Sequence, residues 1–280
     1  MGAESTGAAR TPRFAAIDHH RTQGLTMPAD HFSAVAAQYA QSRPTYPEEL
    51  FDWLAQQCAQ RSLAWDVGAG NGQASVALAG RFDRVLATDL SEDQIARATP
   101  HPRVQYRAAP AHRSGLEAAS ADLVTVAQAL HWFDLDAFYA EVRRVLKRGG
   151  LVAAWSYGVL SVEGDAVGPR VDDFYTRVAG PWWPAERRHV ENGYAELAFP
   201  FEPIAAPRFA IRRRWTLDEL LGYVRSWSAV SRMQQATGTD PVALLDERLA
   251  PDWGTRDTCR LVTWPIAMHA GRAKAAGARP

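Results

Sequence analysis

The strongest motif of this chain is Trp65-Asp66-Val67-Gly68-Ala69-Gly70-Asn71-Gly72-Gln73. It completes a short apolar run that begins at Leu63, and it precedes Ala74–Ala79, where we expect a helix to begin. Small residues after a buried strand let a ligand approach the backbone, and the first turn of the following helix offers free N–H groups. The stretch therefore predicts a strand, a ligand-binding turn and a helix in succession.

An acidic residue ends the next predicted strand. Arg84–Thr88 contains the apolar run Val-Leu-Ala, and Asp89 follows it about one strand–helix unit after the glycine turn. A carboxylate at this place can accept hydrogen bonds from both ribose hydroxyls of a nucleoside. The glycines depart from the dinucleotide fingerprint G-x-G-x-x-G, because Gly72 comes one residue early and Gln73 stands in its place. On the residues alone, a plain strand–helix turn and a nicotinamide-dependent dehydrogenase remain alternatives.

Strands and helices continue to alternate along the chain. Further strands are expected at Val104–Arg107, Leu123–Val126 and Leu151–Trp155. Helices are expected after the capping residues Ser91 and Asp134, and the second of these helices is expected to include Leu146. This alternation predicts a parallel sheet with helices on both faces and a ligand beyond the carboxyl ends of the strands.

The carboxy-terminal part alternates less regularly. Val171–Val178 and Leu217–Trp227 have helical patterns, whereas Phe209–Trp215 and Leu261–Met268 are typical of strands. We expect the two strands to join the same sheet and the helices between them to form a cover.

The glycine turn and the later aspartate resemble motif I and its acidic partner in class I methyltransferases that depend on S-adenosyl-L-methionine (SAM). The segment Arg43-Pro44-Thr45-Tyr46-Pro47 is similar to the amino-terminal cap of one branch, and Val124–Asp134 is similar to its fourth-strand motif. This branch is methyltransferase type 11-like and is related to trans-aconitate methyltransferase-like small-molecule enzymes. The resemblance runs from residue 31 to about residue 272.

The resemblance implies an α/β, Rossmann-like fold with a mostly parallel seven-stranded sheet, helices on both faces and a helical cover. It implies one methyltransferase domain over residues 31–280, in which 161–205 and 216–258 contribute the cover over the acceptor site. Residues 1–30 are rich in small residues and show no periodicity, so we expect a disordered leader there.

Carried over by position, the resemblance also implies a site for SAM and its product S-adenosyl-L-homocysteine. Asp89 would hold the ribose, and Asp66 would help to fix the ammonium group, directly or through water. His112 departs from the branch, which usually has an acidic residue there, so a backbone carbonyl or a neutral imidazole nitrogen would accept the hydrogen bond from the adenine amino group. The implied cofactor-binding residues are Tyr39, Arg43, Asp66, Gly68, Ala69, Gly70, Gln73, Asp89, Leu90, Ala111, His112 and Gln128.

The acceptor site is expected after the fourth predicted strand. His131 and Trp132 are the candidate catalytic residues, although a structural histidine and a core tryptophan are the alternatives. The π face of Trp132 could stabilise a sulfonium, an interaction worth about 0.5–2 kcal/mol. Arg187 and Arg188 could attract an acidic acceptor. The expected substrate-binding residues are Trp132, Trp155, Tyr157 and Trp227.

Composition bounds the remaining possibilities. The chain has 280 residues, a mass of 30.8 kDa and a formal net charge of +0, so no overall field favours nucleic acid or an anionic membrane. No apolar run approaches the ~18 residues of a membrane span, and the 2 cysteines exclude a disulfide framework or a cysteine-rich zinc module. We therefore expect a cytoplasmic monomer or weak homodimer with a small-molecule substrate, no nucleic-acid or membrane partner and no metal.

Together these observations predict a SAM-dependent methyltransferase with a small-molecule acceptor. The methylated atom is expected to be an oxygen of a carboxylate or of a hydroxyl group. Methylation of carbon or nitrogen in a specialised metabolite is one alternative. A SAM-binding protein without catalysis is the other.

Overall fold

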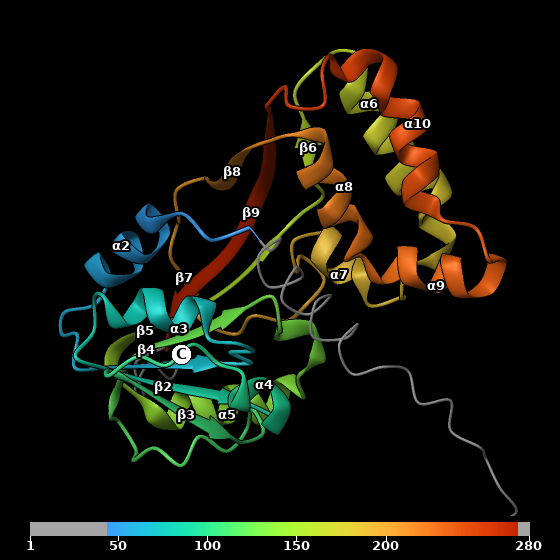
Figure 1. The fold of residues 1–280 in the computed structure, drawn as a ribbon. Coiled ribbons are helices and arrows are strands. Elements are labelled where there is room, and N and C mark those ends of the chain that lie inside the picture. The colour runs from blue at the N-terminus through green and yellow to red at the C-terminus, as the bar shows by residue number, and fades with distance from the viewer. Residues whose placement is uncertain (1–43, 274–280) are drawn as a thin grey trace, which may run out of the picture.

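Five strands pair side by side to form the parallel part of a nine-stranded sheet (Figure 1). The computed structural model describes residues 44–273, so Tyr39, Arg43 and the expected leader over 1–30 lie outside it. In the order β3-β2-β1-β4-β5, each strand is parallel to its neighbour. The strands are β1 (Leu63–Val67), β2 (Arg84–Asp89), β3 (Val104–Ala108), β4 (Ala121–Ala127) and β5 (Leu146–Tyr157).

These five strands lie where the sequence predicts them. The bounds of β1 match the predicted run, and all of its residues are buried, as in a strand covered on both faces. The exception is the start of β5, because Leu146 is expected in the preceding helix. Leu146 instead pairs with Ala121 across the sheet, so the helix ends at Val145.

The antiparallel part of the sheet is built around β9 (Arg260–Arg272). It pairs with β5 and has further partners in β6 (Ser161–Val162), β7 (Glu202–Pro203) and β8 (Phe209–Trp215). Seven strands form one continuous path, and β7 and β8 pair with β9 outside it. The carboxy-terminal strands thus join the same sheet, as expected, and the sheet has two strands more than the seven predicted.

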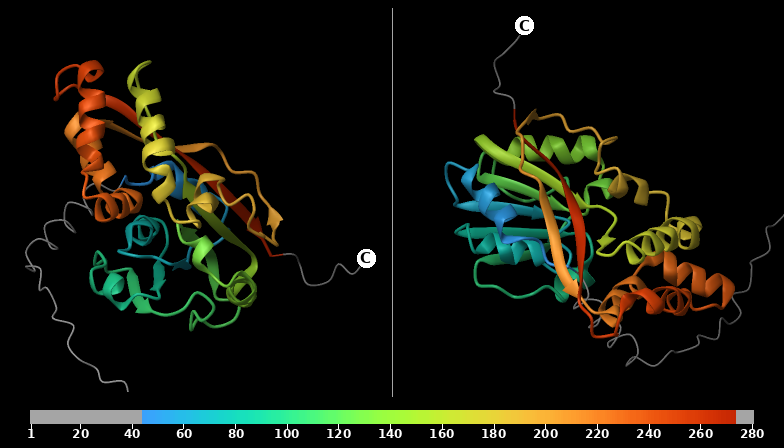
Figure 2. Two further views of the ribbon diagram at one scale, coloured as in Figure 1. Left: turned by 90° about the vertical axis from the view of Figure 1, so that its right-hand side faces the viewer. Right: turned by 90° about the horizontal axis from the view of Figure 1, so that it is seen from above.

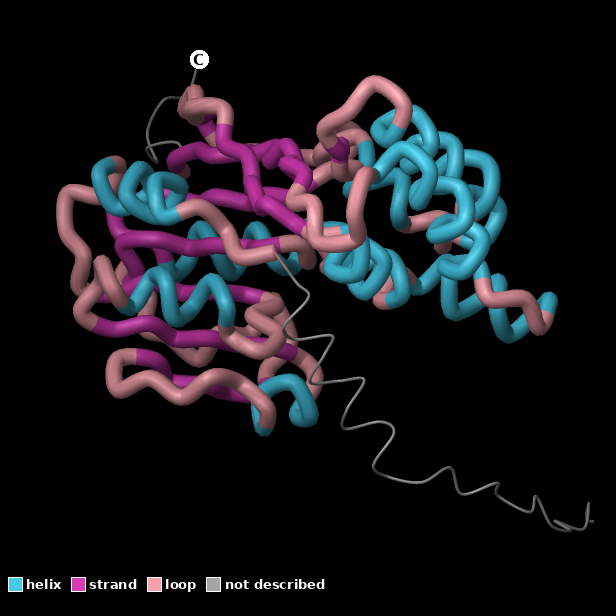
Figure 3. Tube along the Cα trace, turned by 45° about the horizontal axis from the view of Figure 1, so that its top comes forward, coloured by secondary structure: helices cyan, strands magenta, loops and turns pink. Residues whose placement is uncertain are grey.

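Helices cover both faces of the sheet (Figure 3). Alternate residues of a strand point to opposite faces, so Ala64 belongs to one apolar cluster and Trp65 to the other. Leu78 packs in the first cluster, and Phe138 packs in the second. The helices that accompany the parallel strands are α2 (Glu48–Gln56), α3 (Gln73–Ala79), α4 (Glu92–Ala96) and α5 (Leu135–Val145).

A second group of helices lies beside the sheet, where β8 and β9 reach it (Figure 2). Several of their apolar residues, among them Val171, Leu220 and Leu249, belong to the same cluster as Trp264 of β9. The α-helices of this group are α6 (Val167–Asp173), α7 (Arg187–Glu191), α8 (Leu217–Arg225), α9 (Ser228–Thr237) and α10 (Pro241–Trp253). A π-helical turn (Phe174–Val178) and short 3-10 turns at Leu130–Trp132 and Gly180–Trp182 complete the helical elements.

Two kinds of feature are absent from residues 44–273. No helix there is both long and apolar enough to span a bilayer. No group of three or more His, Cys, Asp and Glu side chains in that part is arranged to hold a metal ion.

A buried carboxylate joins three strands at their amino ends. The side chain of Asp122, 5% exposed, accepts hydrogen bonds from the backbone N–H groups of Ser62 at 2.8 Å and Leu63 at 3.0 Å. It also pairs with the ammonium group of Lys147 at 2.7 Å. Asp122 thus links β1, β4 and β5 opposite the end where the ligand turn lies.

Replacement of Asp122 should destabilise the fold strongly. Asp122→Ala leaves two buried N–H groups without their acceptor, and we expect the free energy of unfolding to fall by about 2–4 kcal/mol in urea denaturation. The exposed Asp52, which pairs with Arg81 at 2.8 Å, is the control. Asp52→Ala should cost about 1 kcal/mol or less, and equal losses in the two variants would contradict the role of Asp122.

Candidate functional site

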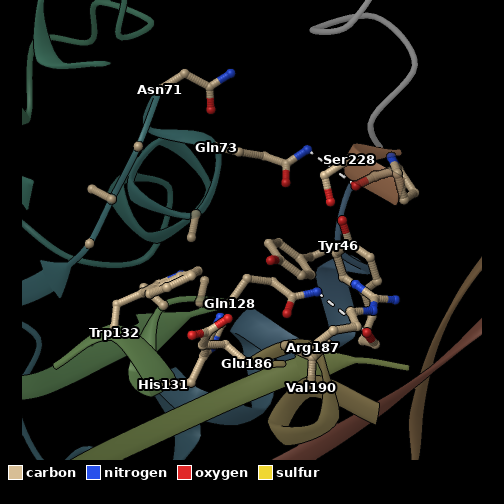
Figure 4. Close-up of a pocket in the computed structure, with 18 of the residues that line it drawn as sticks. Tyr46, Asn71, Gln73, Gln128, His131, Trp132, Glu186, Arg187, Val190 and Ser228 are labelled. Carbon is tan, nitrogen blue, oxygen red and sulfur yellow. Dashed lines mark hydrogen bonds between the residues drawn. The ribbon is translucent and has the colours of Figure 1, made fainter. Parts of the chain in front are cut away.

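A pocket of about 440 Å³ lies beyond the carboxyl ends of β1, β4 and β5. One wall is the glycine turn, and the opposite wall comes from α7, the segment before it and the start of α9. Figure 4 shows His131 and Trp132 on one side of this space and Arg187 and Ser228 on the other. The pocket lies where the strand order reverses between β1 and β4, which is where open α/β sheets bind ligands.

Glycine is required at two positions of the turn. Gly68 has φ of 67°, and a Cβ there would lie 2.6 Å from the Cβ of Ala129. Gly72 has φ of 86°, and a Cβ there would collide with the ring of Tyr106. Both positions therefore need a residue without a side chain, and Gly68, Ala69 and Gly70 present their backbone to the pocket.

Asp66 lies beneath the turn and does not line the pocket. Its carboxylate is fully buried and accepts hydrogen bonds from Ser75 Oγ at 2.6 Å and Thr125 Oγ1 at 2.8 Å. Burial raises the pKa of Asp66 to about 6, although the two hydroxyl groups act against this rise. Asp66 therefore connects β1 to α3 and β4.

Asp89 holds the turn from the side. One carboxylate oxygen accepts the N–H of Gly70 at 2.8 Å, and the other accepts the N–H of Ser91 at 2.9 Å. Leu90 beside it is 78% exposed, and it is one of two large apolar side chains that are exposed in the described part of the chain. Ala111 and His112 follow β3 and do not line the pocket, but the loop before them donates a hydrogen bond to the backbone oxygen of Asp89.

Two glutamines from the predicted site lie in the pocket. Gln128 directly follows β4 and has φ of 61°, a conformation that few residues other than glycine adopt. Its Nε2 donates to the backbone oxygen of Tyr157 at 3.4 Å, and Tyr157 also lines the pocket. Gln73 Nε2 donates to the backbone oxygen of Pro44 at 3.4 Å, which connects α3 to the start of the described chain.

His131 and Trp132 lie together in the turn after β4. Their ring centroids are 4.7 Å apart, and Trp132 is 64% exposed. His131 Nδ1 lies 3.3 Å from the hydroxyl oxygen of Tyr194. Burial, together with the nearby His189 and Arg187, lowers the pKa of His131 to about 4, and Glu186 acts against this shift. His131 is therefore a neutral imidazole around pH 7.

Arg187 brings a positive charge to the opposite wall. Its Nε donates to the hydroxyl oxygen of Tyr175 at 3.0 Å and lies 3.7 Å from the carboxylate of Glu191. Its guanidinium carbon lies 4.9 Å from the ring centre of Trp183. Among the described residues, no acceptor is hydrogen-bonded to its two terminal nitrogens, so these remain available to a ligand.

Two of the expected substrate-binding residues lie away from the pocket. Trp155 is fully buried and packs edge-on against Tyr46, with centroids 5.6 Å apart, because its side chain points to the face that α2 covers. Trp227 is 7% exposed and packs behind Trp183, which lines the pocket, with the two ring centroids 5.5 Å apart. Neither tryptophan lines the pocket in the part of the chain that the structure describes, and a substrate contact at either of them stays a prediction.

Other pocket residues were not among the sequence predictions. Tyr46 belongs to a segment that the sequence singles out, and Ser228 adjoins the predicted Trp227. Glu186 carries no sequence signal of its own, since it is an ordinary charged residue in an irregular segment.

Comparison with known proteins identifies the family. A model described as a methyltransferase domain matches residues 65–154. A Dictyostelium discoideum protein that carries the name of a methyltransferase is 33% identical over 231 residues, which cover 81% of this chain and 88% of that protein. The chain belongs to the class I SAM-dependent methyltransferases.

A solved structure supports the same assignment. A type II methyltransferase from Anaeromyxobacter dehalogenans is similar, with 48% identity and a TM-score of 0.79 over 82% of this chain and 97% of that one. A methyltransferase of Aspergillus candidus is 28% identical over 65% of this chain and 64% of its own length. The methyltransferase therefore uses SAM, whereas the names of these relatives specify no acceptor.

The raised pKa of Asp66 predicts a pH-dependent loss of stability. The folded chain holds this proton up to about pH 6, whereas the unfolded chain releases it near the ordinary value of 3.8. The stabilisation from Asp66 is therefore present below about pH 4 and is lost as pH rises through 6. Relative to Asp66→Asn, the wild-type free energy of unfolding should fall by about 2–3 kcal/mol between pH 4 and 7.

The measurement is urea denaturation of both proteins at several pH values. Asp93→Asn, at an exposed position of α4, serves as the control and should follow the wild-type curve. A constant difference between wild type and Asp66→Asn across this pH range would show that Asp66 is ionised throughout.

Proposed function

We propose that this methyltransferase methylates an oxygen of a small organic acid, with a carboxylate as the acceptor. The observation that carries the proposal is the pairing, across one pocket, of a weakly basic His131 with an Arg187 whose terminal nitrogens are available. The volume of about 440 Å³ is typical of small-molecule sites.

The residues around the glycine turn fit the cofactor. The backbone of Gly68–Gly70 would pass beneath its methionine part, Asp89 would accept the ribose hydroxyls, and the exposed Leu90 would pack on adenine. Asp66 would act by shaping the turn, since its oxygens are buried and already accept two hydrogen bonds. Bound SAM supplies a methyl group on a positively charged sulfur, which is electrophilic without further activation.

The basicity of His131 favours a carboxylate over a hydroxyl acceptor. A general base that removes a proton from a hydroxyl works best when its pKa lies near the working pH, whereas the pKa of His131 is lowered to about 4. A carboxylate is already ionised and needs no base. His131 would then orient the acceptor oxygen, and Trp132 would exclude water beside the transferred methyl group.

The charge of the opposite wall favours an acid as well. Arg187 would attract an anionic acceptor, and its stacking on Trp183 and hydrogen bond to Tyr175 hold the guanidinium in place. Among the described residues that line the pocket, the acidic one is the exposed Glu186. Its negative charge would disfavour an acceptor whose anionic group lies close to it. We also propose that 161–205 and 216–258 form the cover of the acceptor site, because Arg187 and Ser228 come from them.

Loss of Asp89 should weaken cofactor binding. Asp89→Ala removes the hydrogen bonds to the ribose, and calorimetry should show the affinity for SAM reduced by about 1.5–3 kcal/mol. Asp93→Ala on the exposed side of α4 is the control and should bind normally. Unchanged affinity in Asp89→Ala would remove Asp89 from the site.

An acceptor panel tests the proposed function. Purified protein with SAM should release S-adenosyl-L-homocysteine with small carboxylic acids, and much less with the corresponding alcohols, amines and methyl esters. Arg187→Gln should lower kcat/KM for the best acid by about 10- to 100-fold, as expected for lost charged hydrogen bonds, with SAM affinity unchanged.

The matched control is Arg188→Gln, because the Arg188 side chain is 70% exposed and pairs only weakly with Glu196 at 4.0 Å. It should retain normal turnover. Preference for alcohols or amines would overturn the carboxylate assignment, and SAM binding without any product would indicate a binding protein.

A further inference from the structure

Tyr194 has a backbone conformation that is costly for its residue type. Its φ is 65°, in the left-handed region that bulky residues rarely adopt, and it follows Gly193 with φ of 63°. The Tyr194 N–H donates to the backbone oxygen of His189 at 2.7 Å, which closes the turn after α7. Strained residues of this kind persist only where the surroundings enforce them, and they concentrate at functional sites.

The turn is attached to the sheet from two strands. His269 Nε2 on β9 donates to the backbone oxygen of Gly193 at 2.8 Å. Ser156 Oγ on β5 donates to the backbone oxygen of Val190 at 3.4 Å. A Cβ on Gly193 would lie 2.5 Å from the Cβ of Ala267, so the turn also packs closely on β9. These contacts fix where the side chain of Tyr194 points.

That side chain is fully buried and ends at His131. The hydroxyl oxygen lies 3.3 Å from His131 Nδ1, and the two ring centroids are 5.8 Å apart. Burial raises the pKa of Tyr194 above its usual range, so the hydroxyl keeps its proton at neutral pH, although the backbone of Leu130 acts against the rise. The protonated hydroxyl can therefore donate its hydrogen to Nδ1.

We propose that Tyr194 is a positioning residue for methyl transfer, which donates its hydroxyl hydrogen to His131 Nδ1 and so fixes the tautomer that carries hydrogen on Nε2. His131 then serves as a hydrogen-bond donor to the acceptor oxygen. The part of this inference that concerns the acceptor rests on the proposed function. The part that concerns the tautomer rests on the described contacts alone.

The charged and titratable groups that face His131 are consistent with this role. They come from α7, from the residue before it and from the turn after it, and they are Tyr194, His189, Arg187 and Glu186. The positive charge of Arg187 and the burial of the ring disfavour imidazolium, while Glu186 acts in the opposite direction. A neutral ring whose Nδ1 accepts a hydrogen bond has only Nε2 left as a donor.

The test compares Tyr194→Phe with the wild type in the complex with S-adenosyl-L-homocysteine. Long-range ¹H–¹⁵N NMR spectra of the imidazoles should show His131 with hydrogen on Nε2 in the wild type, and a mixture of both tautomers in the variant. With the best acid of the panel, kcat/KM should fall by about tenfold, the size expected for one lost hydrogen bond. Cofactor affinity should stay unchanged, and the added Tyr194→Phe substitution should have no effect in a His131→Gln background.

Tyr139→Phe is the matched control. Tyr139 belongs to the same apolar cluster as Tyr194, but its hydroxyl donates to the backbone oxygen of Ala198 at 2.7 Å. It should keep the wild-type His131 spectrum and kcat/KM. A wild-type spectrum in Tyr194→Phe, or an undiminished effect in the His131→Gln background, would overturn the proposal. If instead no acid is methylated while the spectra change as expected, the proposed acceptor fails and the positioning role stands.

Discussion

The hydrogen bonds of one buried carboxylate hold the ligand-binding edge of the sheet together. Asp66 is the last residue but one of β1 and has no exposed surface, and its two oxygens accept hydrogen bonds from the hydroxyl groups of Ser75 on α3 and Thr125 on β4. The glycine turn leaves the strand directly above this point, and Asp89 fixes it from β2 through the N–H of Gly70. The shape of the cofactor wall therefore depends on an acid that does not itself reach the pocket. This arrangement explains why a group with a raised pKa is kept in the core at a cost in stability.

The first strand and the glycine turn could be predicted from the sequence because their signals are local. The run Leu63–Val67 is apolar at nearly every position, as in a strand buried on both faces, and the glycines follow it directly. Such a run does not alternate between apolar and polar residues, however, so the sequence does not show which face of the sheet a given side chain points to. The apolar run Leu151–Trp155 has the same property. The sequence therefore places Trp155 at the pocket, whereas its side chain packs on α2. The start of β5 was missed for a related reason, since only pairing with Ala121 distinguishes Leu146 from a residue in the last turn of α5.

The contacts of the proposed acceptor site could not be predicted from the sequence in this way, because they join segments that lie far apart along the chain. His131 and Tyr194 are 63 positions apart, and the turn that carries Tyr194 is positioned by residues of β5 and β9. A tyrosine after a glycine in an irregular segment has no local feature that separates it from a packing residue. Arg187 was noticed for its charge, but charge alone does not distinguish a solvated arginine from one stacked on Trp183 with its terminal nitrogens available.

The two halves of the site therefore differ in how they can change. The glycine turn permits few substitutions, since a side chain at Gly68 meets Ala129 and one at Gly72 meets Tyr106. The opposite wall comes from α7 and α9, which lie between strands that pair with β9, so their residues can vary while the parallel sheet stays intact. The turn at Gly193 is an exception, because it packs on β9 and reaches His131 through the next residue. If Arg187 binds the acceptor, as we propose, a change of acceptor would require new residues around Arg187, while the turn at Gly193 would stay as it is.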